Sequence, residues 1–230
     1  MPRLISGKIS YCLNPPGKPE TEFGREVFSM SVQANGLRTL RVLCEFDDIG
    51  LTRDVTYTVD ADWHPVEAYV RIAEEDRALG SGWFRFTDTY AEGEGFTVSE
   101  GRFHQRISLD RPLNAFGSHP ICSDIWKLAR LPKAKVGETV ILDNAVNTSP
   151  LASGESGPIM AMRSYPYVYK GEETIEVRSG TYTCQRWDWP VRDGKTLCMW
   201  TTAGEDFLPI RMTFPEGNKI YDLVELNVRD

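Results

Sequence analysis

Alternation of apolar and polar residues dominates this chain. In "TRDVTYTVD" (52–60), Val55, Tyr57 and Val59 would share one face of an extended segment. A period of two, rich in β-branched and aromatic residues, is typical of half-buried strands. The same period recurs at 8–13, 27–33, 37–46, 66–73, 82–90, 102–109, 174–180, 181–189, 196–202, 208–214 and 219–228. The pattern therefore predicts roughly ten to twelve strands.

Short turns join many of these segments. "QANG" (33–36) and "PEGN" (215–218) supply Asn and Gly where a tight turn needs a positive backbone angle. Strands joined so closely pair as hairpins, and a sheet of this size must protect its edges by curvature, closure or a covering helix. We therefore expect an all-β fold, a strongly curved antiparallel meander that forms a half-barrel or a partly closed, calycin-like barrel.

One segment departs from this rhythm. Ile121, Ile125 and Leu128 are spaced like the apolar stripe of a helix, and Ser118 precedes them as a candidate N-cap. The pattern predicts a helix over 118–131 that plugs or covers the curved sheet.

Composition supports one packed unit. Hydrophobic residues make up 41% of the 230 residues and aromatic residues 11%, which is enough for a core and argues against general disorder. Residues 132–160 are richer in Gly, Ser, Pro and Lys, and we expect them to form an irregular connecting excursion. Residues 1–230 are thus predicted to be a single β-rich domain.

Charge and cysteine content narrow the classes of protein. A net charge of -7 disfavours nucleic acid as a partner. The chain has neither an apolar run long enough to enter a membrane nor a signal-peptide core, so a cytoplasmic protein is expected. Five cysteines without a Cys-x-x-Cys pair point to reduced thiols, with a bridge between Cys184 and Cys198 as the alternative.

The carboxy-terminal third has a recognisable spacing of predicted strands. The residues that mark this pattern are Gly180, Tyr182, Cys184, Trp200, Pro209 and Arg211. Residues 171–228 thereby resemble a bacterial domain family of unknown function, whose folds are similar to the lipoprotein-carrier half-barrel and to the small enzyme that rearranges an indole intermediate in violacein biosynthesis. The resemblance implies a curved antiparallel sheet with a concavity suited to apolar or aromatic ligands. It assigns no catalytic residue.

The stretch "GRFHQRISLDRPLNAFGSHPICSDIW" (101–126) holds two of the three histidines. A period of two places Arg102, His104 and Arg106 on the same strand face. Two guanidinium groups beside an imidazole would lower its pKa and keep it neutral, so that it could act as a base. The alternative is that this face is simply exposed to solvent.

Two further side chains are candidates for acid–base chemistry. His119 lies at the start of the predicted helix, whose free N–H groups could hold an anion, although a capping role explains it equally well. Tyr182 is a candidate acid. A zinc site built from His64, His104 and His119 lacks paired ligand spacing, so no metal and no cofactor are predicted.

Aromatic and polar side chains could form the walls of a pocket for an aromatic ligand. The candidate substrate-binding residues are Phe116, Asp124, Trp126, Trp83, Trp200 and Arg186. The alternative is that most of the aromatic residues pack the sheet against the helix.

Three functions fit these patterns. The first is a cofactor-independent lyase, isomerase or hydratase that uses His and Arg on a small apolar or aromatic substrate. The second is a non-catalytic binding or carrier protein for such a molecule. The third is a structural or interaction domain with a solid core. A second copy of the chain, as in a homodimer, is a potential partner for the protein in any of these roles.

Overall fold

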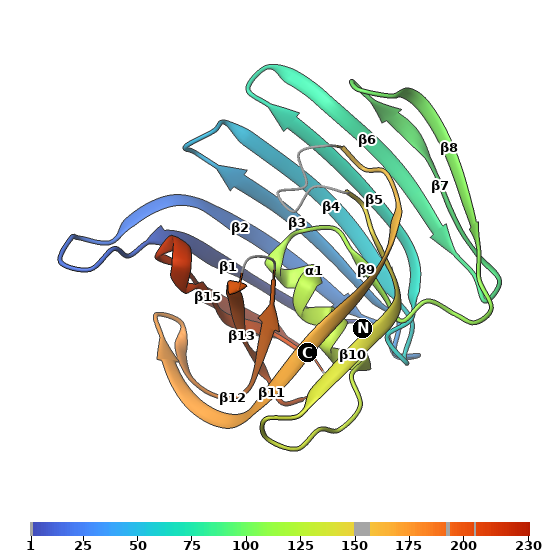
Figure 1. Cartoon of the computed structure of the whole chain (residues 1–230). Coiled ribbons are helices and arrows are strands. Elements are labelled where there is room, and N and C mark those ends of the chain that lie inside the picture. Colours follow the sequence, from blue (N-terminus) through green and yellow to red (C-terminus); the bar gives the residue numbers. More distant parts are fainter. Residues whose placement is uncertain (1, 150–156, 192–193, 205) are drawn as a thin grey trace.

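The computed structural model describes residues 2–149, 157–191, 194–204 and 206–230. They form a fifteen-stranded sheet of order β8-β7-β6-β5-β4-β3-β2-β1-β15-β14-β13-β12-β11-β10-β9 (Figure 1). All neighbours are antiparallel except β9 and β10, which are parallel. The strands are β1 (Arg3–Leu13), β2 (Thr21–Val32), β3 (Arg38–Phe46), β4 (Leu51–Val59), β5 (Pro65–Glu74), β6 (Arg77–Phe86), β7 (Tyr90–Thr97), β8 (Gly101–Ser108), β9 (Ala115–Gly117), β10 (Thr139–Asn147), β11 (Ala161–Val177), β12 (Gly180–Pro190), β13 (Thr196–Thr202), β14 (Pro209–Phe214) and β15 (Lys219–Arg229).

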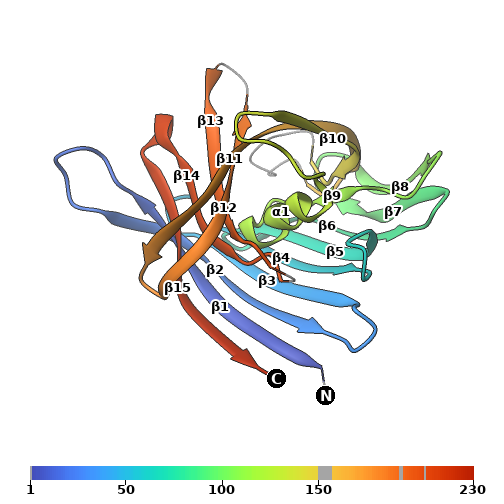
Figure 2. The same cartoon turned by 90° about the horizontal axis from the view of Figure 1, so that it is seen from below.

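The sheet is strongly curved and does not close into a barrel. Strands β1 to β8 form one broad part, and strands β15 back to β9 curl over it, so that α1 (Ile121–Trp126) and the 3-10 turn η1 (Lys127–Arg130) lie between the two parts (Figure 2). A second 3-10 turn, η3, spans Pro215–Gly217. The predicted all-β class and the curved, partly closed antiparallel meander are confirmed.

The helix is shorter than predicted, and another residue caps it. The α-helical part of the predicted 118–131 segment begins only after Pro120. Instead of capping the helix, the Ser118 hydroxyl donates a hydrogen bond to Ser123 Oγ at 2.9 Å. The backbone N–H groups of Ile121 and Cys122 donate to the carboxylate of Glu26 on β2. The Ser118 N-cap prediction is therefore wrong, because a buried carboxylate from a neighbouring strand takes that role.

The interior around α1 is filled with side chains. Phe116 and Trp126 are buried, and their rings each lie 5.5 Å from the ring of Tyr57 on β4. Ile125 of α1 is fully buried. These two predicted substrate-binding residues therefore belong to the packed core.

Several strands were not predicted. The segment 132–160 contains β10, and its residues 150–156 lie outside the described part of the chain. Most of β11, as well as β7 and β9, also escaped prediction. The predicted strand 82–90 corresponds to β6, which ends at Phe86.

The cysteines are all buried and unbridged. In the pairing of β12 with β13, Cys184 lies opposite Thr202 and Cys198 lies opposite Asp188. The two thiols are thus separated by several positions along the strands, and a bridge between them is excluded. The prediction of reduced thiols is confirmed. Among the described residues, no helix has the length and apolar character needed to cross a bilayer.

Candidate functional site

The two parts of the curved sheet contact each other through hydrogen bonds of a side chain rather than through a strand ladder. The backbone N–H of Met160 donates to Oε1 of Gln105 on β8 at 2.8 Å, and Nε2 of Gln105 donates to the Met160 carbonyl at 3.3 Å. Glycines make room for this crossing. A Cβ on Gly80 would lie 3.1 Å from Pro158, and one on Gly93 would lie 3.2 Å from Met160. We call this contact the Gln105 bridge.

A second contact joins the same two parts beyond the end of β8. Arg111 forms an ion pair with Asp143 of β10 at 2.7 Å. The amide nitrogen of Asn114 donates to the carbonyl and the carboxylate of Asp143 at 3.1 and 3.2 Å. The amide nitrogen of Asn144 donates to the carbonyl of Pro112 at 2.8 Å. We call this contact the Arg111 bridge.

A bulge in β10 positions two of these side chains. Pairing with β11 is interrupted after Leu142 and resumes at Ala145, so that β10 carries one extra residue. Asn144 in this bulge has a φ of 49°, a left-handed conformation that Asn adopts more readily than most residues. Bulges commonly re-aim side chains beside binding sites. Here the bulge directs Asp143 and Asn144 toward the loop after β8.

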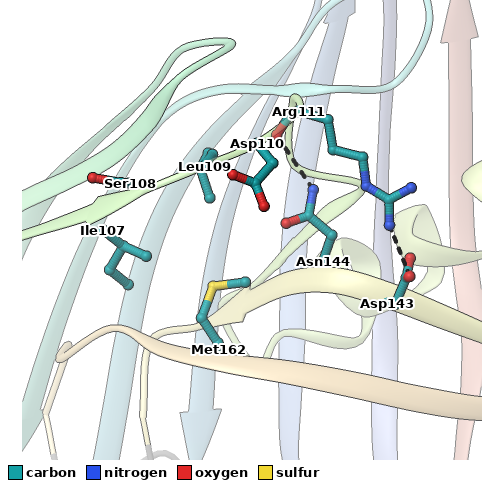
Figure 3. A pocket seen from close by; sticks show the side chains of 8 residues that line it. All are labelled: Ile107, Ser108, Leu109, Asp110, Arg111, Asp143, Asn144 and Met162. Carbon is teal, nitrogen blue, oxygen red and sulfur yellow. Dashed lines mark hydrogen bonds and ion pairs between the residues drawn. The ribbon is translucent and has the colours of Figure 1, made fainter.

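Between the two bridges a groove of about 350 Å³ opens at the surface (Figure 3). It is lined by Ile107, Ser108, Leu109, Asp110, Arg111, Asp143, Asn144 and Met162. Its volume falls within the range of small-molecule sites, and mouths of barrel-like sheets are common places for such sites. Ile107 and Leu109 are half-buried and Met162 is 41% exposed, so the groove has an apolar floor.

The polar end of the groove presents mainly acceptors. The guanidinium of Arg111 is engaged by Asp143, and the amide nitrogen of Asn144 is engaged by backbone carbonyls. The carboxylate of Asp110 has no hydrogen bond or ion pair within the described part of the chain. This arrangement can hold a hydrogen-bond donor beside an apolar surface.

The side chains predicted for catalysis on β8 lie on its outer face, away from the groove. Arg102, His104 and Arg106 share one face of β8, as the period of two predicted, but that face is exposed to solvent. The imidazole of His104 is 61% exposed and pairs with Glu92 at 3.0 Å, and Arg106 stacks on Tyr90 at 3.9 Å. The solvent-exposed alternative for this face is the one observed, because the odd-numbered residues of β8 face inward. Their catalytic role stays a prediction.

The other candidates for proton transfer lie in separate elements. His119 is half-buried just before α1, with a φ of 75°. The hydroxyl of Tyr182 donates to the carbonyl of Ser179 in its own hairpin turn at 3.3 Å. Nδ1 of His64 donates to the carbonyl of Leu113 at 2.8 Å. The described residues include all three histidines and contain no group of three His, Cys, Asp or Glu side chains that could hold a metal ion, so the zinc site considered above is not assembled.

The predicted substrate-binding residues on the other strands do not converge either. Trp83 is 38% exposed on the outer face of β6. Trp200 packs against Arg186, whose guanidinium lies 5.0 Å from the indole ring and pairs with Asp188 at 3.0 Å. Trp83 on β6 is separated in the strand order from Trp200 on β13 and Arg186 on β12 by β5 to β1, β15 and β14, so the sheet does not place these side chains side by side.

Asp124 belongs to a buried ion pair. Its carboxylate lies 2.6 Å from the ammonium of Lys127, which is 3% exposed and lies 4.7 Å from the ring of Tyr165. Burial lowers the pKa of Lys127, but Asp124 and the phenol of Tyr165 outweigh that effect and raise it. Burial raises the pKa of Tyr165, and the ammonium opposes this rise. Asp124 therefore neutralises a charge in the core rather than facing the groove.

Five of the eight residues that line the groove come from one stretch of the sequence, although none of them was a candidate site residue. Residues 107–111 fall within the stretch 101–126 that held the candidate chemistry. Asp143, Asn144 and Met162 were missed because they lie in or beside the segment expected to be irregular. One signal was available, since the Asp-Asn pair in "TVILDNAVN" (139–147) interrupts an apolar alternation, as a bulge does.

Comparisons with known proteins support the fold. No protein-family model and no curated protein matches the chain. A solved beta-barrel-like protein of the domain of unknown function DUF1849 from Brucella abortus is similar over 100% of this chain and 98% of its own, with 12% identity and a TM-score of 0.57. The likeness is one of fold. A DUF1089 family protein from Pseudomonas aeruginosa matches over 84% of this chain and 90% of its own, with 14% identity and a TM-score of 0.45. The DUF1849 structure supports the predicted likeness to bacterial proteins of unknown function at the level of the fold, and it shows no link to violacein biosynthesis.

Proposed function

We propose that the groove binds a small, largely apolar molecule and that the chain acts as a binding protein. The observation that carries this proposal is the opening between the Gln105 and Arg111 bridges, where apolar side chains are held at the surface beside polar groups. Three of the eight lining residues are apolar and five are polar, so the groove can contact an apolar body and hold a polar group of the same molecule. None of the side chains predicted for catalysis lines it.

A neutral fluorescent probe tests the proposal. N-phenyl-1-naphthylamine should bind the wild-type protein with a rise in fluorescence, because burial removes its rings from water. Met162→Glu places a charge on the apolar floor and should raise the Kd of the probe roughly tenfold or more.

Ile141→Glu is the matched control. Ile141 is an apolar residue of β10 that is 57% exposed and does not line the groove, so its replacement should leave the Kd unchanged. Equal affinity of the probe for both variants and the wild type would place binding elsewhere and contradict the proposal, as would the absence of binding.

A further inference from the structure

We infer that the groove selects ligands that carry an amine cation at one end of an apolar body. This inference rests on the proposed function and adds the charge of the ligand to it. The first support is the orientation of Asn144. Its amide nitrogen donates to the carbonyls of Pro112 at 2.8 Å and Arg111 at 3.4 Å. The amide oxygen is therefore turned toward the groove as an acceptor (Figure 3).

The second support is the carboxylate of Asp110. It is turned into the groove in Figure 3, above Met162. In the described part of the chain no cation pairs with it. Asp110 and Asn144 together offer acceptors from two different segments, the loop after β8 and the bulge of β10.

The third support is the balance of charge. Of the eight lining residues, Arg111 alone is basic, and it already pairs with Asp143 at 2.7 Å. The two carboxylates and one guanidinium leave the groove with one net negative charge. An ammonium group brings three donors and a positive charge to these acceptors, whereas a carboxylate would be repelled by Asp110. The alkyl or aryl body would then lie on Ile107, Leu109 and Met162.

Ligands that share one chain length but differ in charge separate the effect of charge on affinity from the effect of apolar contact. Octylamine, 1-octanol and octanoate compete with N-phenyl-1-naphthylamine for the wild-type protein at pH 7. We expect octylamine to bind about two- to fivefold more tightly than 1-octanol, because an exposed ion pair contributes only modestly. Octanoate should bind most weakly, because Asp110 repels its carboxylate. The preference for the amine should shrink in 0.5 M salt, since salt screens exposed charges.

Asp110→Asn should abolish the preference for octylamine over 1-octanol, because the neutral amide no longer attracts the ammonium group. Asp88→Asn is the matched control, because Asp88 is an exposed residue in the β6–β7 loop that does not line the groove. This variant should keep the full preference.

The outcomes distinguish the two proposals. If octylamine binds no better than 1-octanol, or if the preference survives in Asp110→Asn, the inference about charge is overturned while apolar binding stands. If calcium chloride displaces the probe as well as octylamine does, the groove is a simple cation site and the inference is also overturned. If no member of the series competes, both proposals fail.

Discussion

Glycine at position 117 allows β9 to lie close to β10, because it carries no Cβ. Gly117 pairs with Asn147, and a Cβ at residue 117 would lie 1.9 Å from Oδ1 of Asn147 and 2.8 Å from Nζ of Lys127. Lys127 cannot easily move, because it is buried and paired with Asp124 at 2.6 Å. Glycine is therefore needed at position 117 to leave room for the side chains of Asn147 and Lys127, and not because of an unusual backbone angle.

Replacing Gly117 with Ala should therefore destabilise the fold. We expect Gly117→Ala to lower the free energy of unfolding by about 1–3 kcal/mol, because the added methyl group forces Asn147 or Lys127 to shift. Gly204→Ala is the control, since a Cβ there meets nothing within 4 Å, and its effect should stay within about 0.5 kcal/mol. Urea unfolding of both variants measures this, and equal effects would contradict the explanation.

At the scale of elements, α1 depends on a carboxylate from a distant part of the sequence. Glu26 is fully buried on β2 and accepts hydrogen bonds from Tyr11 and from the N–H groups of Ile121 and Cys122. Burial raises its pKa above 4.5, although these donors oppose the rise. The apolar spacing along 118–131 predicted the helix itself. It could not predict the cap, because Glu26 precedes Ile121 by 95 residues.

Because the pKa of Glu26 is raised, its contribution to the stability of the fold decreases as the pH rises. Between pH 4.5 and the raised pKa, the native state binds a proton that the unfolded state has released. The contribution of Glu26 is therefore fully present below pH 4.5 and is lost as the pH rises through its raised pKa. The unfolding free energy of the wild type, relative to Glu26→Gln, should fall as the pH rises across this window, which urea titrations at a series of pH values measure.

Glu22→Gln provides the opposite case. A hydrogen bond from Ser10 lowers the pKa of Glu22, so its contribution is present above pH 4.5 and is lost as the pH falls through the lowered value. The wild type should lose stability relative to Glu22→Gln on acidification. The same sign for both variants would contradict the assignment of these shifts to burial and to hydrogen bonding.

The alternation of apolar and polar residues identified the strands that have one apolar face. It did not identify strands in which glycines or a bulge interrupt the alternation. In β7, "YAEGEGFT", Gly93 and Gly95 leave little alternation to detect, yet a Cβ on Gly93 would meet Phe84 at 2.7 Å. In β10 the bulge at Asp143 and Asn144 breaks the period within the strand. Both features serve contacts with other strands, so the local pattern alone could not reveal them.

At the scale of the whole molecule, curvature decides which strand face is the inside. The period of two on β8 separated Arg102, His104 and Arg106 from their neighbours correctly but could not tell which set faces the core. That choice depends on the segment before β11, which crosses the inner face of β8 and binds Gln105. The groove exists only because this crossing and the Arg111 bridge leave a gap between them, and no local pattern encodes such a gap.

If the Gln105 bridge holds the two parts of the sheet together, its loss should loosen one side of the groove. Gln105→Ala removes both hydrogen bonds to the Met160 backbone, which should cost about 1 kcal/mol and raise the rate of amide exchange at Met160 roughly fivefold. Hydrogen exchange followed by mass spectrometry measures the segment 157–163. Gln185→Ala on β12 is the control, since no side-chain hydrogen bond of Gln185 occurs in the described structure, and it should leave this segment unchanged. Exchange that stays as slow in Gln105→Ala as in the wild type would contradict this role of the bridge. Packing of Met160 and Pro158 against the glycines of β6 and β7 would then be sufficient to keep the sheet curved, and the groove would keep its shape without the bridge.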